Sequence, residues 1–250
     1  MLAWEKLSDE EKEIVSQIKS SFAPETKVQF VTKKTFSPSK IVYAEGGCPR
    51  FWYFMFSGVE AHNVYSHESL RAMAAGTAAH DELQKRLAES DLDIVIEQEL
   101  LYDDPPIRSF ADGVITTSEG NKIPLEIKTT RTEAYGYRES SFIPAEYNVL
   151  QLLCYMKILG ADKGLLLYED RNSFDNLIIP VYMNEENTKI VDDAFQWLRD
   201  VRVAFDVGTL PKYFAGRRSN SKICKTCPIK QACNDAGEGV VDLRLLKDKP

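Results

Sequence analysis

Two carboxylates and a lysine lie in neighbouring apolar stretches of the chain. Asp112 stands in the first stretch, and Glu126 and Lys128 stand in the second. Alternate residues of a β-strand project from the same face, so Glu126 and Lys128 are expected about 7 Å apart with Ile127 behind them. Converging carboxylates repel one another unless a cation sits between them, and such oxygen ligands suit Mg²⁺ or Mn²⁺. A neighbouring lysine can position or deprotonate a water beside that ion.

The residues around these three predict a β-hairpin. Apolar segments at 107–116 and 122–129 are joined by Ser118-Glu119-Gly120-Asn121, in which Gly and Asn tolerate left-handed backbone. A preceding strand is predicted at 93–101, with Glu97 and Glu99 on one face. The alternative is a surface hairpin that carries a glutamate and a lysine on its solvated side.

Helical and extended patterns alternate along the rest of the chain. A capping box at Ser8-Asp9-Glu10-Glu11 starts a helix to about residue 21, which is expected to pack through Ile14, Val15 and Ile18. Further helices are predicted at 69–88, 144–160 and 185–207, further strands at 163–168 and 177–183, and a polar loop at 131–142. This order predicts an α/β fold with a central mixed sheet flanked by helices.

Polar residues on two predicted helices are further candidates. Gly76 and His80 are four residues apart and share a helix face, so a partner can approach at Gly76 while His80 projects beside it. Gln151 and Tyr155 also lie one turn apart on an apolar helix. These two either satisfy each other at the edge of the core or face the site. His62 and His67 are expected in a polar connecting loop.

Composition limits the classes of function. The net charge is -7 and the pI near 5.2, which argues against non-specific coating of nucleic acid but leaves room for a local basic groove. No segment approaches the roughly 20 apolar residues that span a bilayer. The first residues are too charged for a signal peptide, so we expect a soluble, cytoplasmic protein without a membrane partner.

Five cysteines form an odd set, which makes a disulfide framework unexpected. Cys224, Cys227 and Cys233 follow a C-x2-C-x5-C pattern, one ligand short of a closed tetrahedral site. Cys48, flanked by proline, is the natural fourth ligand, whereas Cys154 lies within a predicted helix and is expected to be an inert core thiol. By count, four thiolates fit zinc or a four-iron cluster equally well.

Six motifs now stand in order along the chain. They are Cys48-Pro49-Arg50, Gly76-x3-His80, Ala111-Asp112-Gly113, Glu126-Ile127-Lys128, Gln151-x3-Tyr155 and Cys224-x2-Cys227-Pro228-x4-Cys233. With them the chain resembles the RecB-type nucleases of the PD-(D/E)xK superfamily, in particular the iron-sulfur exonucleases of the CRISPR-associated and phage-encoded type, and also the AddB nuclease domain. One departure is Ala111, which stands where the superfamily's name has proline.

The resemblance implies roles for these residues. His80, Asp112, Glu126 and the backbone carbonyl of Ile127 would ligate Mn²⁺ or Mg²⁺, and Lys128 would orient the attacking water. Gln151 and Tyr155 would contact the DNA strand or brace the site. A 4Fe-4S cluster would be held by Cys48, Cys224, Cys227 and Cys233. The implied architecture is a single nuclease domain over 1–250, with an N-terminal helical part (1–90), a restriction-endonuclease-like core (91–207) and a C-terminal cysteine segment (208–250) that packs with Cys48.

The expected function is a metal-dependent DNA exonuclease acting on single-stranded ends in phage or CRISPR-related DNA processing. The alternative is an iron-sulfur DNA-binding subunit that hands DNA ends to an integrase or helicase partner, and a third reading is a zinc-ribbon-like structural module. The aromatic run 51–56 either offers bases a stacking surface or fills the core around the cysteines. A basic rim for DNA is expected at Arg131, Arg138, Arg217, Arg218 and Lys222.

Overall fold

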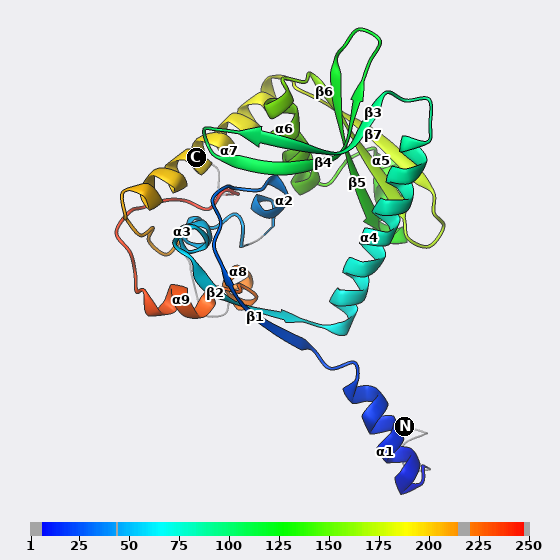
Figure 1. The fold of residues 1–250 in the computed structure, drawn as a ribbon, viewed down its shortest axis with the longest axis vertical. Helices are drawn as coiled ribbons and strands as arrows, with labels where there is room; N and C mark the ends of the chain where they lie inside the picture. Colours follow the sequence, from blue (N-terminus) through cyan, green and yellow to red (C-terminus); the bar gives the residue numbers. More distant parts are fainter. Residues whose placement is uncertain (1–6, 44, 215–220, 248–250) are drawn as a thin grey trace.

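A five-stranded mixed β-sheet forms the centre of the molecule (Figure 1). The computed structural model describes residues 7–43, 45–214 and 221–247. The strand order is β3-β4-β5-β6-β7, with bounds β3 Ile94–Tyr102, β4 Ile107–Thr116, β5 Lys122–Thr130, β6 Lys163–Asp170 and β7 Asn176–Tyr182. Within this sheet β5 and β6 are parallel and the other neighbours are antiparallel. The α/β class with a mixed sheet is thereby confirmed.

Helices surround this sheet, and a separate antiparallel ribbon lies beside it. The helices are α1 Asp9–Ser20, α2 Pro38–Ile41, α3 Pro49–Ser57, α4 His67–Ala88, α5 Thr132–Ser141, α6 Glu146–Leu159, α7 Glu185–Asp206, α8 Lys222–Lys225 and α9 Lys230–Asp235. The ribbon consists of β1 Glu25–Val31 and β2 Val59–Tyr65. No helix in the described ranges combines the length and apolar content that crossing a bilayer requires.

The long helices α4 and α6 cover opposite faces of the sheet. Leu167 of β6 packs in a small cluster with Leu83 of α4, whereas its neighbour Leu166 belongs to the main core together with Leu152 of α6. Successive strand residues point to opposite faces, so the two helices enclose the sheet between them. A residue of β5 can therefore be reached from either helix.

The N-terminal part differs from the predicted helical arrangement. The capping box at Ser8 is present and starts α1 as expected. However, α1 buries no residue and extends away from the body in Figure 1, so the expectation that it packs is wrong. The ribbon β1–β2 was not predicted, and it places His62 in a strand, while His67 begins α4, so neither is in a loop.

Segment 131–142 contains a helix where a polar loop was expected. Residues Thr132–Ser141 form α5, which ends at Phe142 with φ 57. Tyr135 is the one buried residue of this helix. A helix this polar is held by its place beside β6 more than by an apolar stripe, which is why periodicity did not reveal it.

The aromatic run after Cys48 forms α3 and fills the core. Phe51, Trp52 and Phe56 are buried, and the rings of Trp52 and Phe36 meet edge to face with centroids 4.9 Å apart. The Trp52 indole donates a 2.7 Å hydrogen bond to the Gly46 carbonyl. These three rings therefore support the core alternative, because bases cannot stack on rings that solvent does not reach.

Replacing Trp52 is expected to be costly. Trp52→Ala removes a side chain that is 1% exposed and should lower the free energy of unfolding by about 3–5 kcal/mol, because a large cavity is left behind. Chemical denaturation measures the change. The matched control is Phe30→Ala on β1, a ring that is 74% exposed and whose loss should change stability by no more than about 0.5 kcal/mol. Equal losses in both variants would contradict this packing.

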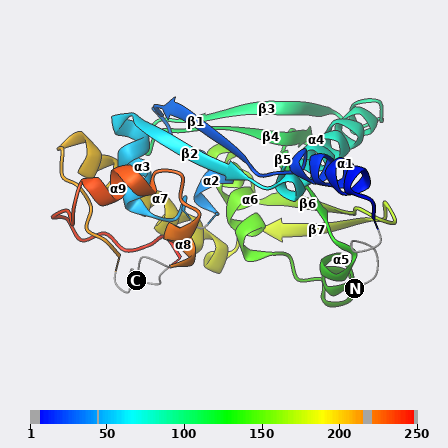
Figure 2. The ribbon, with the colours of Figure 1, turned by 90° about the horizontal axis from the view of Figure 1, so that it is seen from below.

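The C-terminal segment returns to the region of Cys48. Figure 2 shows α8 and α9 beside α3 and β2. The Leu246 N–H donates to the Gly47 carbonyl at 2.9 Å, and the His62 N–H donates to the Pro228 carbonyl at 2.8 Å. Backbone hydrogen bonds thereby join residues that are separated by most of the chain.

Candidate active site and cysteine site

The candidate site lies where β4 and β5 separate. Their pairing runs from Thr116 opposite Lys122 to Gly113 opposite Leu125, and Asp112 and Glu126 are the next residues on each strand. Beyond that point the Asp112 Oδ2 accepts a 2.6 Å hydrogen bond from the Ile127 N–H. The aspartate side chain thus takes a backbone donor that the strand pairing no longer satisfies, which fixes the carboxylate at the fork.

His80 reaches this fork from α4. Its Nδ1 lies 3.5 Å from Asp112 Oδ1, and both side chains are partly exposed. Interaction with Asp112 raises the pKa of His80 above its ordinary value, against the opposing effect of burial. The helix that carries Gly76 passes over β5, with the Gly76 position close to Thr129. The structure therefore brings the imidazole of His80 next to the carboxylate of Asp112.

Glu126 is a buried carboxylate with one satisfied oxygen. Its Oε1 accepts hydrogen bonds from Lys128 and, at 2.8 Å, from Gln151. Its Oε2 is buried and has no hydrogen-bond partner within the described residues. Burial, followed by the charge of Asp112, raises the pKa of Glu126 to about 7. A buried carboxylate oxygen without a partner is costly unless a cation or another donor meets it.

Gln151 and Tyr155 stand behind Glu126 on α6. The Gln151 Nε2 lies 2.8 Å from the Tyr155 hydroxyl and 2.8 Å from Glu126 Oε1, and both side chains are buried. Burial, and then the charge of Glu126, raises the pKa of Tyr155 well above its ordinary value. This geometry supports bracing of Glu126, because buried groups in this position offer no surface to a DNA strand.

Lys128 holds its charge beside Glu126. Burial alone would lower its pKa, but the charge of Glu126 and the hydrogen bond to it outweigh burial, and the pKa is raised. The ammonium is thus protonated at neutral pH and acts as a donor. A protonated ammonium can position a water by donating a hydrogen bond to it, but it cannot remove a proton from that water.

The oxygen and nitrogen donors of Asp112, Glu126 and His80 are of the kinds that bind a hard divalent cation. Their atoms are nevertheless not arranged around a common point. No group of three or more His, Cys, Asp or Glu side chains over 7–43, 45–214 and 221–247 has that arrangement. The reason at this fork is that Glu126 Oε1 is bound by Lys128 and Asp112 Oδ2 by the Ile127 N–H. Glu126 Oε2 remains for a cation, and Asp112 Oδ1 and the His80 imidazole would have to exchange their mutual contact for the ion to become ligands of it.

Sequence reasoning missed two residues that support Asp112. Gln84 of α4 is buried and donates to the Asp112 carbonyl at 3.1 Å and to Glu97 Oε1 at 2.7 Å. Glu97 lies in β3 with φ 50, a left-handed backbone that costs energy for a residue other than glycine. The burial of β3 still alternates across Glu97 and Glu99, and its register with β4 is the same on both sides of Glu97. Neither residue stood out in the sequence as part of the site.

Another acidic residue also lies near the site. Glu169 at the end of β6 is buried, and burial, followed by the charge of Glu82, raises its pKa while His80 opposes that shift. Two acidic residues that follow Tyr168 at the end of a predicted strand are the sequence feature that could have indicated Glu169. The field around His80 is therefore negative, which favours a cation there.

The residues expected to form a basic rim have different environments. Arg131 is exposed and donates to Glu68 at 3.2 Å. Arg138 lies 4.8 Å from the Tyr168 ring centroid and donates to the Ala134 carbonyl. Lys222 begins α8. Arg217 and Arg218 are outside the described residues.

Four cysteines line one pocket between α3 and the C-terminal helices. They are Cys48, Cys224, Cys227 and Cys233. Burial raises the pKa of Cys48 to about 11 and that of Cys227 to about 12, and the neighbouring thiols of this set add to both shifts. Cys48 and Cys227 are thus neutral thiols unless a cation draws off their protons. Cys154 is buried in α6, apart from this pocket, as expected of a core thiol.

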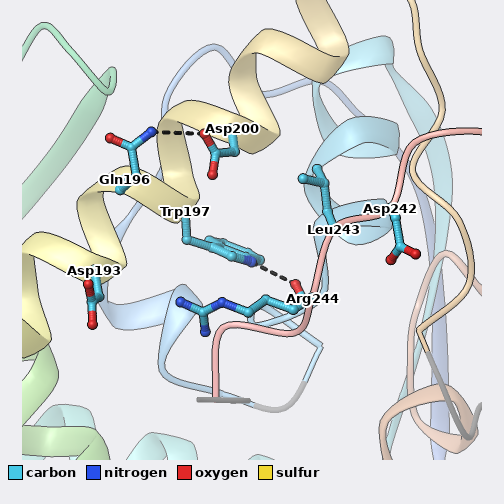
Figure 3. Close-up of a pocket in the computed structure, with 7 residues that line it drawn as sticks. All are labelled: Asp193, Gln196, Trp197, Asp200, Asp242, Leu243 and Arg244. Carbon is cyan, nitrogen blue, oxygen red and sulfur yellow. Dashed lines mark hydrogen bonds between the residues drawn. The ribbon is translucent and has the colours of Figure 1, made fainter. Parts of the chain in front are cut away.

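A further pocket lies between α7 and the C-terminal segment (Figure 3). Asp193, Asp200 and Asp242 line it, and the indole of Trp197 donates a 2.8 Å hydrogen bond to the Arg244 carbonyl. Three carboxylates in one hollow repel a phosphate backbone. This face is therefore unsuited to DNA.

Comparisons with known proteins give distant structural likenesses. No family model and no curated protein matches the chain. The solved structure titled "Crystal structure of SSO0001" is 16% identical, covers 94% of this chain and 100% of its own, and has a TM-score of 0.48. An alkaline exonuclease (LHK-Exo) from Laribacter hongkongensis is 13% identical over 54% of this chain and 71% of its own, with a TM-score of 0.44. Its complex with dAMP is 12% identical over 55% and 70%, with a TM-score of 0.45. Matches at this level assign no activity to the chain.

Proposed function

We propose that this protein is a divalent-metal-dependent deoxyribonuclease. The observation that carries the proposal is the fork of β4 and β5, where His80 Nδ1 lies 3.5 Å from Asp112 Oδ1 and the buried Glu126 Oε2 has no hydrogen-bond partner in the described part of the chain. Lys128 contacts the same glutamate. A protein that merely binds DNA has no need for this set of groups in one place.

In the proposed site each residue has one task. Asp112, Glu126, His80 and the carbonyl of Ile127 would hold Mn²⁺ or Mg²⁺. The N–H and C=O of one strand residue point to the same neighbour, so the Ile127 carbonyl faces the same side as the N–H that binds Asp112. The bound ion would supply an activated water and neutralise the leaving oxygen. Lys128 donates to that water and orients it, while Gln151 and Tyr155 hold Glu126 in place.

We further propose that the substrate is DNA with single-stranded ends, cut by exonucleolytic hydrolysis in phage or CRISPR-related processing. The exposed Arg131, which directly follows the end of β5, supports a path for the phosphate backbone along that edge. The second candidate is a DNA-binding subunit that passes ends to an integrase or helicase. Such a subunit would not need a buried glutamate such as Glu126 that can bind a cation.

Digestion of end-labelled DNA tests the proposed activity. The protein is incubated with single- and double-stranded oligonucleotides and Mn²⁺, with a parallel reaction in excess chelator. The expected result is a ladder of shortened products from single-stranded ends, and none with chelator. If the protein binds the DNA but leaves it intact with every divalent metal ion tested, the result would support the DNA-binding subunit and overturn the proposed nuclease activity.

A preference for Mn²⁺ over Mg²⁺ is expected. His80 offers a nitrogen ligand, and nitrogen suits manganese better than it suits magnesium. Initial cleavage rates should therefore be higher with Mn²⁺ at matched concentrations. His80→Asn should reduce the ratio of the two rates, because it removes the imidazole while keeping a polar side chain. Equal or faster cleavage with Mg²⁺ in the parent protein would reject the expected ligand set.

We also propose that the four-cysteine pocket holds a 4Fe-4S cluster with a structural role. What supports the proposal is that four sulfur donors, from α3's N-terminus and from the C-terminal segment, line one pocket. Iron and acid-labile sulfide, measured on protein purified without oxygen, test the cluster. Zinc without sulfide would favour the zinc-ribbon-like module instead.

A further inference from the structure

Arg50 is a fully buried guanidinium held entirely by the C-terminal segment. It is 1% exposed and stands two residues after Cys48. It donates to the carbonyls of Pro211, Cys233, Gly237 and Glu238 at 2.6–2.9 Å. Its Nε donates to the Cys233 Sγ at 3.1 Å. Every donor nitrogen of this side chain is thus directed at the segment that carries three of the pocket's cysteines.

No carboxylate among the described residues forms an ion pair with this buried positive charge. The guanidinium carbon lies 4.1 Å from the centroid of the Tyr213 ring and 5.8 Å from that of the Phe54 ring. Carbonyl oxygens and an aromatic face compensate a buried cation only in part. Arginine stays protonated in proteins, so the charge cannot be removed by losing a proton. An anion beside Arg50 would therefore complete its compensation.

Four thiolates around a metal centre would provide that anion. Either Zn²⁺ or an oxidised four-iron core bound by four thiolates leaves a net charge of about minus two. The Cys233 sulfur that Arg50 touches is one of the four, and Arg50 itself lines the same pocket. For either occupant, Arg50 would therefore offset one of about two negative charges.

We propose that Arg50 is the counter-charge of the cysteine site and the positioning residue for Cys233. Its guanidinium offsets the negative charge of the loaded site, and its Nε–H fixes one ligand sulfur. The inference rests on the proposed cysteine site but not on the nuclease activity. It also assigns a role to the third residue of Cys48-Pro49-Arg50 beyond its carbonyl contacts.

A purely structural clamp is the competing role, and coupling to the metal distinguishes the two. The carbonyl hydrogen bonds involve no metal atom, so a clamp would lose the same stability whether or not metal is bound. A counter-charge instead loses more in the loaded form, because only then is its anion present. The stability gained on loading is the readout that a clamp alone would leave unchanged.

The test compares the parent protein with Arg50→Gln, Arg50→Lys and a matched control, Arg202→Gln. Arg202 is an arginine of α7 that packs on Phe56 and binds Asp206, away from the cysteines. Each protein is purified without oxygen. Its iron, zinc and sulfide contents, the rate of metal loss into excess chelator, and the urea midpoints of the loaded and chelator-treated forms are measured.

Metal loss is expected to be about ten- to a hundredfold faster in Arg50→Gln, the size typical of outer-shell partners of a metal site. Arg50→Lys keeps the charge and should fall between Arg50→Gln and the parent, and it preserves the test if Arg50→Gln does not fold. Arg202→Gln should release metal like the parent. The urea midpoint should rise on loading by more in the parent than in either Arg50 variant.

Two results would overturn the inference, and they differ. If the parent holds metal and both Arg50 variants release it at the parent's rate, Arg50 is only a clamp. If the parent holds no metal that depends on Cys224, the cysteine site itself is absent and the counter-charge role is lost with it. Neither result depends on DNA cleavage.

Discussion

Glu126→Ala is expected to abolish DNA cleavage, with a fall in rate of about a thousandfold or more. The substitution removes a ligand of the proposed cation and leaves Lys128 and Gln151 without the oxygen that both now bind. A loss of about 4 kcal/mol of transition-state stabilisation corresponds to that factor. Cleavage of end-labelled DNA with Mn²⁺ measures the rate.

Two companion variants make this result specific. Glu126→Gln keeps the shape of the side chain and should be about as inactive as Glu126→Ala, because the lost negative charge is what matters. Glu99→Ala is the matched control: it removes another carboxylate, exposed on β3 and paired with Arg108, and should cleave like the parent. Cleavage by Glu126→Ala at the parent's rate would show that the site is wrongly assigned.

Loss of the cysteine site is expected to open the two ends of the chain before the sheet. Cys224→Ser removes one of the four proposed ligands. A link between Cys48 and the C-terminal cysteines closes a loop of roughly 175 residues, and a cross-link of that span contributes about 5 kcal/mol if it acts like a disulfide. Hydrogen exchange should rise first in α8, α9 and the segment around Gly47, while β4 to β6 remain protected.

Cys154→Ala is the control for this second experiment. It removes the cysteine that is buried in α6 and lies outside the pocket. Any loss of stability should then be spread over the core, and metal content should stay at the parent's value. Opening of the C-terminal segment in Cys154→Ala, or simultaneous opening of sheet and ends in Cys224→Ser, would contradict a structural role for the cysteine site.

Much of the sheet and the proximity of its polar residues could be predicted from local patterns. Strand alternation placed Glu126 and Lys128 together, and the turn at Gly120, which has φ 83, joined them to Asp112. Apolar periodicity gave α4, α6 and α7 to within a few residues. These features depend on neighbours in the sequence, which is why the sequence reveals them.

Features that depend on distant contacts could not be predicted. The ribbon β1–β2 and the polar helix α5 have little apolar patterning, so their pairing partners decide their form. Gln84 reaches Asp112 only because α4 crosses the sheet, and Glu97 adopts its left-handed backbone beside it. The burial of Arg50 depends on the return of the C-terminal segment across most of the chain.

The most direct test of the central claim is anomalous scattering from Mn²⁺ in crystals of the protein. We expect one ion at the fork of β4 and β5, about 2.1 Å from Asp112 Oδ1, from the presently unpartnered Glu126 Oε2 and from the Ile127 carbonyl, with His80 as a further ligand. Lys128 should lie beside a water bound to that ion. Crystals saturated with Mn²⁺ that show no peak at this fork would contradict the proposed site.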